Sequence, residues 1–80
     1  MRVVVAGSYA YVGEELGGLR IIDISDPAAP ADVGFYNTPW YTEDVAVSGG
    51  YAYLADSDGL HVIDVADPAN PAELALWGTR

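Results

Sequence analysis

The stretch Gly18–Pro27, GLRIIDISDP, and its near-copy Gly59–Pro68, GLHVIDVADP, decide the fold of this chain. Each stretch opens on glycine, continues as a β-branched apolar run and ends in Asp-Pro. Runs of this kind, bounded by glycine and proline, are typical of short β-strands with a turn at either end. The chain therefore contains the same strand-forming unit twice.

The repetition extends well beyond this stretch. Tyr9–Tyr11, YAY, returns as Tyr51–Tyr53, and both Asp-Pro ends are followed by alanine and a second proline. Tyr36 and Trp77 also align, which predicts a shared packing position for a large aromatic ring. The matching positions run from the first residues of the chain to the last, so internal repetition is the main property of this sequence.

We divide the chain into two copies of one unit, residues 1–39 and 40–80, and expect four strands in each. Four short strands in about 40 residues, joined by turns rich in Gly, Asp, Asn and Pro, are typical of a β-propeller blade. No window has the apolar spacing of a helix. The predicted fold is all-β, with two four-stranded antiparallel blades. The expected strands are Val3–Ala6, Tyr9–Gly13, Leu19–Ile24 and Asp32–Tyr36, then Asp44–Ser48, Tyr51–Ala55, Leu60–Val65 and Glu73–Trp77.

The two anchor strands also resemble a known family. Leu19–Asp23, LRIID, and Leu60–Asp64, LHVID, are similar to the motif of the LVIVD-repeat proteins, and both copies have the flanking Tyr-Ala-Tyr and Asp-Pro-Ala-x-Pro. The resemblance implies a bacterial or archaeal β-propeller repeat, with an extracellular or cell-surface location if this chain is like the family. It implies no defined reaction. Members of the family carry many repeats in one chain, whereas this sequence has two.

Two blades do not close a ring, because propellers use about four to eight. The strand Val3–Ala6 is apolar on both faces, which suits a sheet that is covered on both sides. We therefore expect closure by cyclic head-to-tail association. A homotrimer would have six blades and a homotetramer eight, and the trimer is preferred. The sequence begins and ends at blade boundaries, as an excised or engineered repeat pair would, and a natural short gene stays open.

Composition limits the partners. The chain has 80 residues, no cysteine, three basic and 12 acidic residues, and a net charge of −9. So small a chain is marginally stable alone and has no disulfide, which leaves oligomerisation as the available support. Its charge disfavours nucleic acid and anionic membrane surfaces. No run approaches the roughly 20 apolar residues of a membrane helix. The apolar N-terminal run aligns with a strand of the second copy, so we expect no signal peptide there.

The sequence predicts no catalytic activity. It has one histidine and no repeated Ser-His-Asp set, and our leading interpretation is a self-assembling structural scaffold. His61 occupies the position of Arg20 in the other copy and is interpreted as a half-exposed spacer on its strand. Asp23 and Asp64, near the ends of the anchor strands, are expected to bond the local backbone and cap the following turns.

The alternative function is a binding module for a cation, a glycan or a basic peptide. Loops at one end of a rigid scaffold are common binding sites. Asp56-Ser57-Asp58-Gly59 offers oxygen ligands for Ca²⁺, although most positions of an EF-hand loop are missing, and a solvated acidic turn explains the same residues. No other cofactor is expected. The candidate ligand-face residues are Glu14, Glu15, Trp40, Tyr41 and Glu43.

Overall fold

The computed structural model describes residues 1–38 and 40–78, and eight β-strands make up most of this part of the chain. The strand ends differ from the expected ones by at most two residues. The strands are β1 (Arg2–Ala6), β2 (Tyr9–Gly13), β3 (Leu19–Asp23), β4 (Ala31–Tyr36), β5 (Thr42–Ser48), β6 (Tyr51–Asp56), β7 (Gly59–Asp64) and β8 (Ala72–Gly78).

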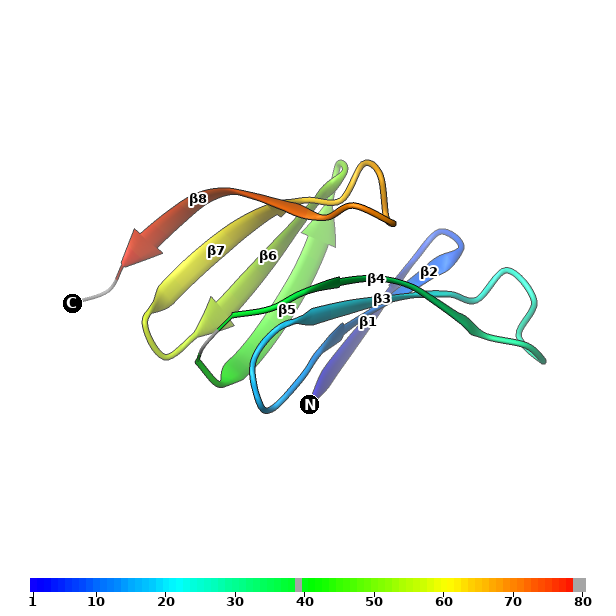
Figure 1. The fold of residues 1–80 in the computed structure, drawn as a ribbon, viewed down its shortest axis with the longest axis horizontal. Helices are drawn as coiled ribbons and strands as arrows, with labels where there is room; N and C mark the ends of the chain where they lie inside the picture. Colours follow the sequence, from blue (N-terminus) through cyan, green and yellow to red (C-terminus); the bar gives the residue numbers. More distant parts are fainter. Residues whose placement is uncertain (39, 79–80) are drawn as a thin grey trace.

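The strands form two antiparallel sheets, with the orders β1-β2-β3-β4 and β5-β6-β7-β8. Each sheet is built from consecutive strands, so no strand crosses from one repeat to the other. The two sheets lie face to face (Figure 1). The predicted all-β fold with two four-stranded antiparallel sheets is confirmed. Within the described residues, no helix is long and apolar enough to span a membrane.

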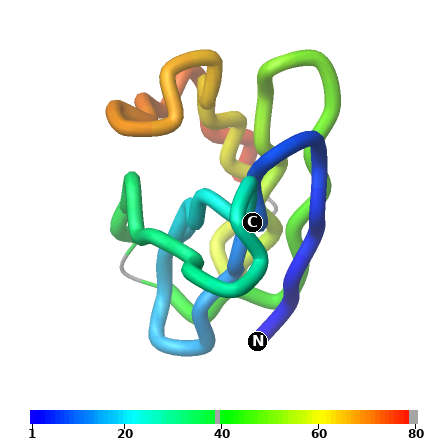
Figure 2. Tube along the Cα trace, turned by 90° about the vertical axis from the view of Figure 1, so that its right-hand side faces the viewer, coloured from blue at the N-terminus to red at the C-terminus, as the bar shows by residue number. Residues whose placement is uncertain are grey.

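Tight glycine turns join the first two strands of each sheet. Gly7 has a φ of 60° and Gly49 a φ of 58°, in the left-handed region that favours glycine. Figure 2 shows these two turns at the same end of the molecule, with the β2–β3 connection at the opposite end. The repeat therefore places equivalent loops on equivalent sides of both sheets.

Aspartate side chains end the anchor strands β3 and β7. Asp23 Oδ1 accepts a hydrogen bond from the Ser25 N–H at 2.8 Å, and Asp64 Oδ1 accepts one from the Ala66 N–H at 2.9 Å. These side-chain bonds turn the backbone out of the ladder. Each strand consequently stops one residue before the expected end, and the predicted capping role of both aspartates is confirmed.

The outermost strand of each sheet contains a β-bulge. The pairing of β3 with β4 shifts between Ile21 and Ile22, and the pairing of β7 with β8 shifts between Val62 and Ile63. A bulge adds one unpaired residue and increases the local twist. The two outer strands are thus bent at equivalent places.

The core lies between the sheets. Leu19 and Ile21 from the first repeat and Leu54 and Ile63 from the second are fully buried. Strand alternation explains this pattern, because residues two apart point to the same face. The buried apolar cluster consists of Tyr11, Leu19, Ile21, Val45, Ala52, Leu54, Ile63 and Val65.

The sheets approach most closely at glycine positions. A Cβ built on Gly34 in β4 would overlap the backbone carbonyl of Pro68. A Cβ on Gly13 would lie 2.8 Å from the Thr42 side chain. The missing side chains therefore set the spacing between the sheets, and the second repeat has alanine at both matching positions, Ala75 and Ala55.

Candidate functional site

A tight turn between β6 and β7 holds two carboxylates. Asp56 ends β6, and its Oδ1 accepts a hydrogen bond from the Asp58 N–H at 3.1 Å. Gly59 follows with a φ of 151° and opens β7. This local bond is the usual way in which aspartate stabilises a turn. It holds the Asp56 carboxylate against the backbone of Asp58, beside the start of β7.

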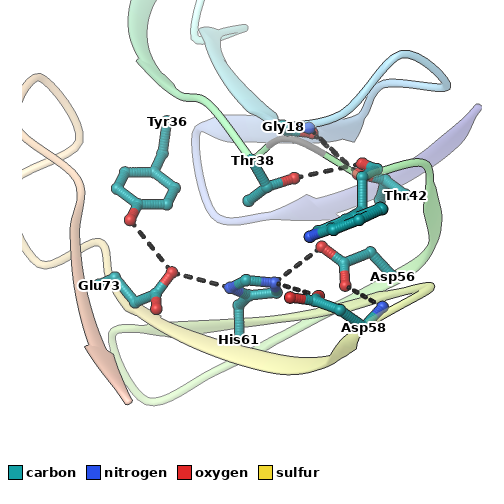
Figure 3. Close-up of polar contacts among 9 residues, drawn as sticks. Gly18, Tyr36, Thr38, Thr42, Asp56, Asp58, His61 and Glu73 are labelled. Carbon is teal, nitrogen blue, oxygen red and sulfur yellow. Dashed lines mark hydrogen bonds and ion pairs between the residues drawn. The ribbon is translucent and has the colours of Figure 1, made fainter. Parts of the chain in front are cut away.

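His61 on β7 brings a third carboxylate to the turn. Its Nε2 lies 2.7 Å from Asp56 Oδ2 and 3.2 Å from Asp58 Oδ1, and its Nδ1 lies 2.8 Å from Glu73 Oε1 on β8 (Figure 3). The side chains of His61 and Asp56 are only 5% and 0% exposed. We call Asp56, Asp58, His61 and Glu73 the His61 cluster. The interpretation of His61 as a half-exposed spacer is wrong, because its ring is buried between the two sheets.

The cluster favours a protonated imidazole. Burial acts to lower the pKa of His61, but the hydrogen bonds with Glu73 and Asp58 and the nearby negative charges prevail and raise it above its usual value of 6.5. Burial is the main cause that raises the pKa of Asp56. The pKa of Asp58 is lowered, and the main cause is its hydrogen bond with Asp56. Asp56 Oδ2 has no hydrogen bond of good geometry within the described residues, so its contact with His61 is an ion pair. A positive charge in the ring offsets the carboxylates around it.

The first repeat closes the site from the opposite sheet. Tyr36 Oη donates a hydrogen bond to Glu73 Oε1 at 3.1 Å, across the space between β4 and β8 (Figure 3). Burial and this bond together raise the pKa of the Tyr36 hydroxyl. Beside them, the Gly18 N–H donates to Thr42 Oγ1 at 3.1 Å. Polar contacts thus tie the two repeats together around the His61 cluster.

A matching arrangement occurs on the far side of the first sheet. Arg20, at the position of His61, lies 3.5 Å from Glu14 and 2.5 Å from Asp32. Its guanidinium carbon lies 4.7 Å from the centre of the Phe35 ring. We call Glu14, Arg20 and Asp32 the Arg20 cluster. Both repeats therefore place a cation among carboxylates, two of them in a partly exposed setting in the first repeat and three in a buried setting in the second.

The comparisons with known proteins agree with this repetition. No curated protein and no solved structure gives a significant match. The family model of the LVIVD repeat matches residues 1–38 and again residues 40–79. The chain belongs to the LVIVD repeat family. Each LVIVD repeat corresponds to one four-stranded sheet, so the resemblance of the two anchor strands to this family is confirmed.

The two LVIVD repeats leave two sheet faces uncovered. In the first repeat, strand register aligns a row of side chains that points away from the second sheet. Its equivalent in the second repeat packs against the first sheet. The two rows are Val3, Val12, Arg20 and Phe35 in the first repeat and Val45, Leu54, His61 and Leu76 in the second. One LVIVD surface therefore occurs twice, once packed and once free.

The opposite surface also occurs twice. In the first repeat it packs inward, with Leu19 and Tyr36 in register on β3 and β4. The equivalent residues of the second repeat, Leu60 and Trp77, are in register on the uncovered face of the second sheet, and Trp77 is 66% exposed. Each LVIVD repeat thus has two different faces, and the chain presents one of each to the outside.

The His61 cluster also includes the predicted metal ligands. Asp56, Asp58 and His61 each offer a ligand atom, and these atoms lie within 4.8 Å of one another. Imidazole nitrogen beside carboxylates suits Zn²⁺ better than Ca²⁺, which prefers oxygen ligands only. The sequence pattern indicated Asp56 and Asp58 as candidate metal ligands, but it did not indicate His61. The aligned pair Arg20 and His61, each followed 12 residues later by an acid, was the signal that could have found it.

The candidate ligand-face residues lie in the β2–β3 loop, in the connection between the repeats and at the start of β5, and Gly17 of the β2–β3 loop lies close to the backbone carbonyl of Trp40. Glu14 pairs with Arg20, while Glu15 is exposed and lines a shallow hollow beside it. Trp40 and Tyr41, in the connection between the repeats, are 42% and 64% exposed. The fifth residue, Glu43, is exposed in β5. Their shared binding of a ligand stays a prediction.

Proposed function

We propose that this chain is a building unit of a closed propeller and assembles head to tail with copies of itself. The observation that carries the proposal is the pair of uncovered faces. They are the repeat equivalents of the two faces that already pack against each other inside the chain. A second copy is therefore a partner of matching shape and chemistry. Association of two unlike faces closes into a ring when the rotation between units allows it.

Exposed apolar side chains support the proposal. Val3 and Val5 are 52% and 63% exposed on the free face of the first repeat, while their equivalents Val45 and Val47 are buried or half-buried. Burial of apolar surface contributes about 25 cal/mol per Å², so covering these residues stabilises the assembly. Three copies would give six blades and four copies eight, and we favour the trimer.

Light scattering on a sizing column tests the assembly directly. We expect a mass of three or four chains of 8.4 kDa each at micromolar concentration. Val5→Glu should shift the mass to one chain, because it places a charge where the next copy would bury a valine. Ser57→Glu is the matched control, since the first repeat carries Glu15 at that position. A folded single chain for the wild type at these concentrations would contradict the proposal.

Metal binding at Asp56, Asp58 and His61 is the second candidate function, favoured by the closeness of their ligand atoms. A metal that binds only the folded chain raises its thermal midpoint. If this candidate function is right, millimolar Zn²⁺ raises the thermal midpoint of unfolding by several degrees over an EDTA control. The Asp58→Asn variant should show no such rise. The effect should increase with pH, because Zn²⁺ must displace the proton on His61. Equal midpoints in Zn²⁺, Ca²⁺ and EDTA would eliminate this candidate.

A further inference from the structure

The contact between the two repeats contains an aromatic residue that docks on a cation flanked by acids. Tyr36 of the first repeat donates its hydroxyl to Glu73 at 3.1 Å, and Glu73 lies 2.8 Å from the His61 ring. The same Glu73 oxygen serves both partners. This aromatic–acid–cation chain is the polar centre of the packed interface.

Every member of that chain has a counterpart on a free face. Alignment of the repeats matches Tyr36 to Trp77, Glu73 to Asp32 and His61 to Arg20. Arg20 and Asp32 are already paired on the free face of the first repeat. The side chain of Trp77 lies exposed on the free face of the second, where it forms no hydrogen bond with the described residues. The two halves of a second docking contact are thus present on opposite sides of one molecule.

We propose that Trp77 of one copy docks on the Arg20 cluster of the next copy. The indole N–H donates to the Asp32 carboxylate, as the Tyr36 hydroxyl donates to Glu73, and the ring lies against the Arg20 guanidinium. Tryptophan has one donor, and its face attracts cations more strongly than that of any other aromatic side chain. Tryptophan and arginine also dominate the energetics of known interfaces. The inference rests on the proposed assembly and names the residues that give it direction.

The free faces differ from the packed ones at one close backbone contact. Gly34, which touches the Pro68 carbonyl inside the chain, is replaced by Ala75 on the free face. The extra methyl group requires a slightly wider spacing at the outer strands of the interface between copies. A hollow of about 510 Å³ lies beside the β2–β3 loop, and its lining includes Glu14 and Phe35, which both contact Arg20.

Sedimentation velocity of the full chain across a concentration series tests the docking. Trp77→Ala should raise the concentration of half-assembly at least tenfold. Trp77→Tyr should recover most of the loss, because it restores the ring and donor that the packed interface uses. Tyr41→Ala is the matched control: Tyr41 is exposed to the same extent as Trp77, 64% against 66%, and lies in the connection between the repeats. We expect no change for this variant, and far-UV circular dichroism verifies that each variant is folded.

Fluorescence adds a readout that folding alone would not change. In a Trp40→Phe background, Trp77 is the remaining tryptophan. Its emission should shift to the red as dilution separates the copies. If the wild type assembles but Trp77→Ala assembles within twofold of it, the docking is wrong and the assembly survives. If the wild type is a single chain at all concentrations, the proposed function itself fails.

Discussion

Replacement of His61 by leucine should lower the free energy of unfolding by about 3–5 kcal/mol, because it leaves the buried carboxylate of Asp56 without its cation. The Asp56 side chain is 0% exposed, and His61 Nε2 at 2.7 Å is its ion-pair partner. Leucine fills a similar volume, so the loss reports mainly on the charge. Urea unfolding followed by far-UV circular dichroism measures the change.

Arg2→Ala provides the matched control for this loss. Arg2 pairs with Asp44 at 3.1 Å, but the two side chains are 57% and 61% exposed. Exposed ion pairs contribute about 1 kcal/mol or less. A similar cost for His61→Leu and Arg2→Ala would contradict the burial of the His61 cluster.

The same histidine should make stability depend on pH. Despite the opposing effect of burial, contacts with Glu73, Asp58 and Asp56 raise the pKa of His61 above 6.5 in the folded chain. The folded state therefore binds the proton more tightly than the unfolded state does. The resulting stabilisation is fully present below pH about 6.5 and is lost as the pH rises through the raised pKa. Thermal midpoints should fall over this range for the wild type and less for His61→Leu, and equal slopes for the two proteins would contradict the assignment.

Ile63→Ala should cost about 2–5 kcal/mol, whereas Ile22→Ala, the same change at the equivalent position of the first repeat, should cost about 1 kcal/mol or less in the single chain. Ile63 is fully buried between the sheets, while Ile22 is half-buried next to the free face. The two variants remove the same atoms from the same kind of strand. The difference between their losses of unfolding free energy measures how much burial by the opposite sheet contributes to stability.

Measuring Ile22→Ala and Ile63→Ala at several protein concentrations gives a second test of assembly. Where copies associate, the free face of the first repeat is covered, and the cost of Ile22→Ala should approach that of Ile63→Ala. Chemical unfolding at sub-micromolar and at high micromolar concentration makes the comparison. A cost of Ile22→Ala that is independent of concentration, in a chain that assembles by light scattering, would mean that the copies meet through other surfaces.

The sequence was sufficient for the sheets and insufficient for the polar site, for one physical reason. The turn residues and the alternation around Leu19 and Leu60 are local signals, and a repeat doubles them. The His61 cluster depends on how far apart two sheets lie. That distance follows from close backbone approaches such as Gly34 on Pro68, which no local pattern records. With 12 acidic residues in the chain, the acids around His61 also did not stand out.

The repeat could still have predicted part of the site. Arg20 and His61 align, and an acidic residue precedes and follows each of them at matching positions, Glu14 and Asp32 or Asp56 and Glu73. Aligned charges of opposite sign on neighbouring strands predict one conserved contact geometry within the blade. The degree of burial differs between the copies and needed the structure.

The bulged outer strands also affect how readily the strand edges could recruit other chains. A strand edge recruits other chains when its backbone groups form a straight, regular row, and the endpoint of that recruitment is a fibre. In β8, which carries the exposed Leu74 and Trp77, the register shift opposite Val62 and Ile63 breaks that row. The apolar side chains remain available to a sheet face, while the backbone beside them is a poor template for continuous stacking. One unpaired residue in the outer strand of each sheet therefore places exposed apolar side chains beside an irregular backbone edge, an arrangement that disfavours amyloid-like stacking.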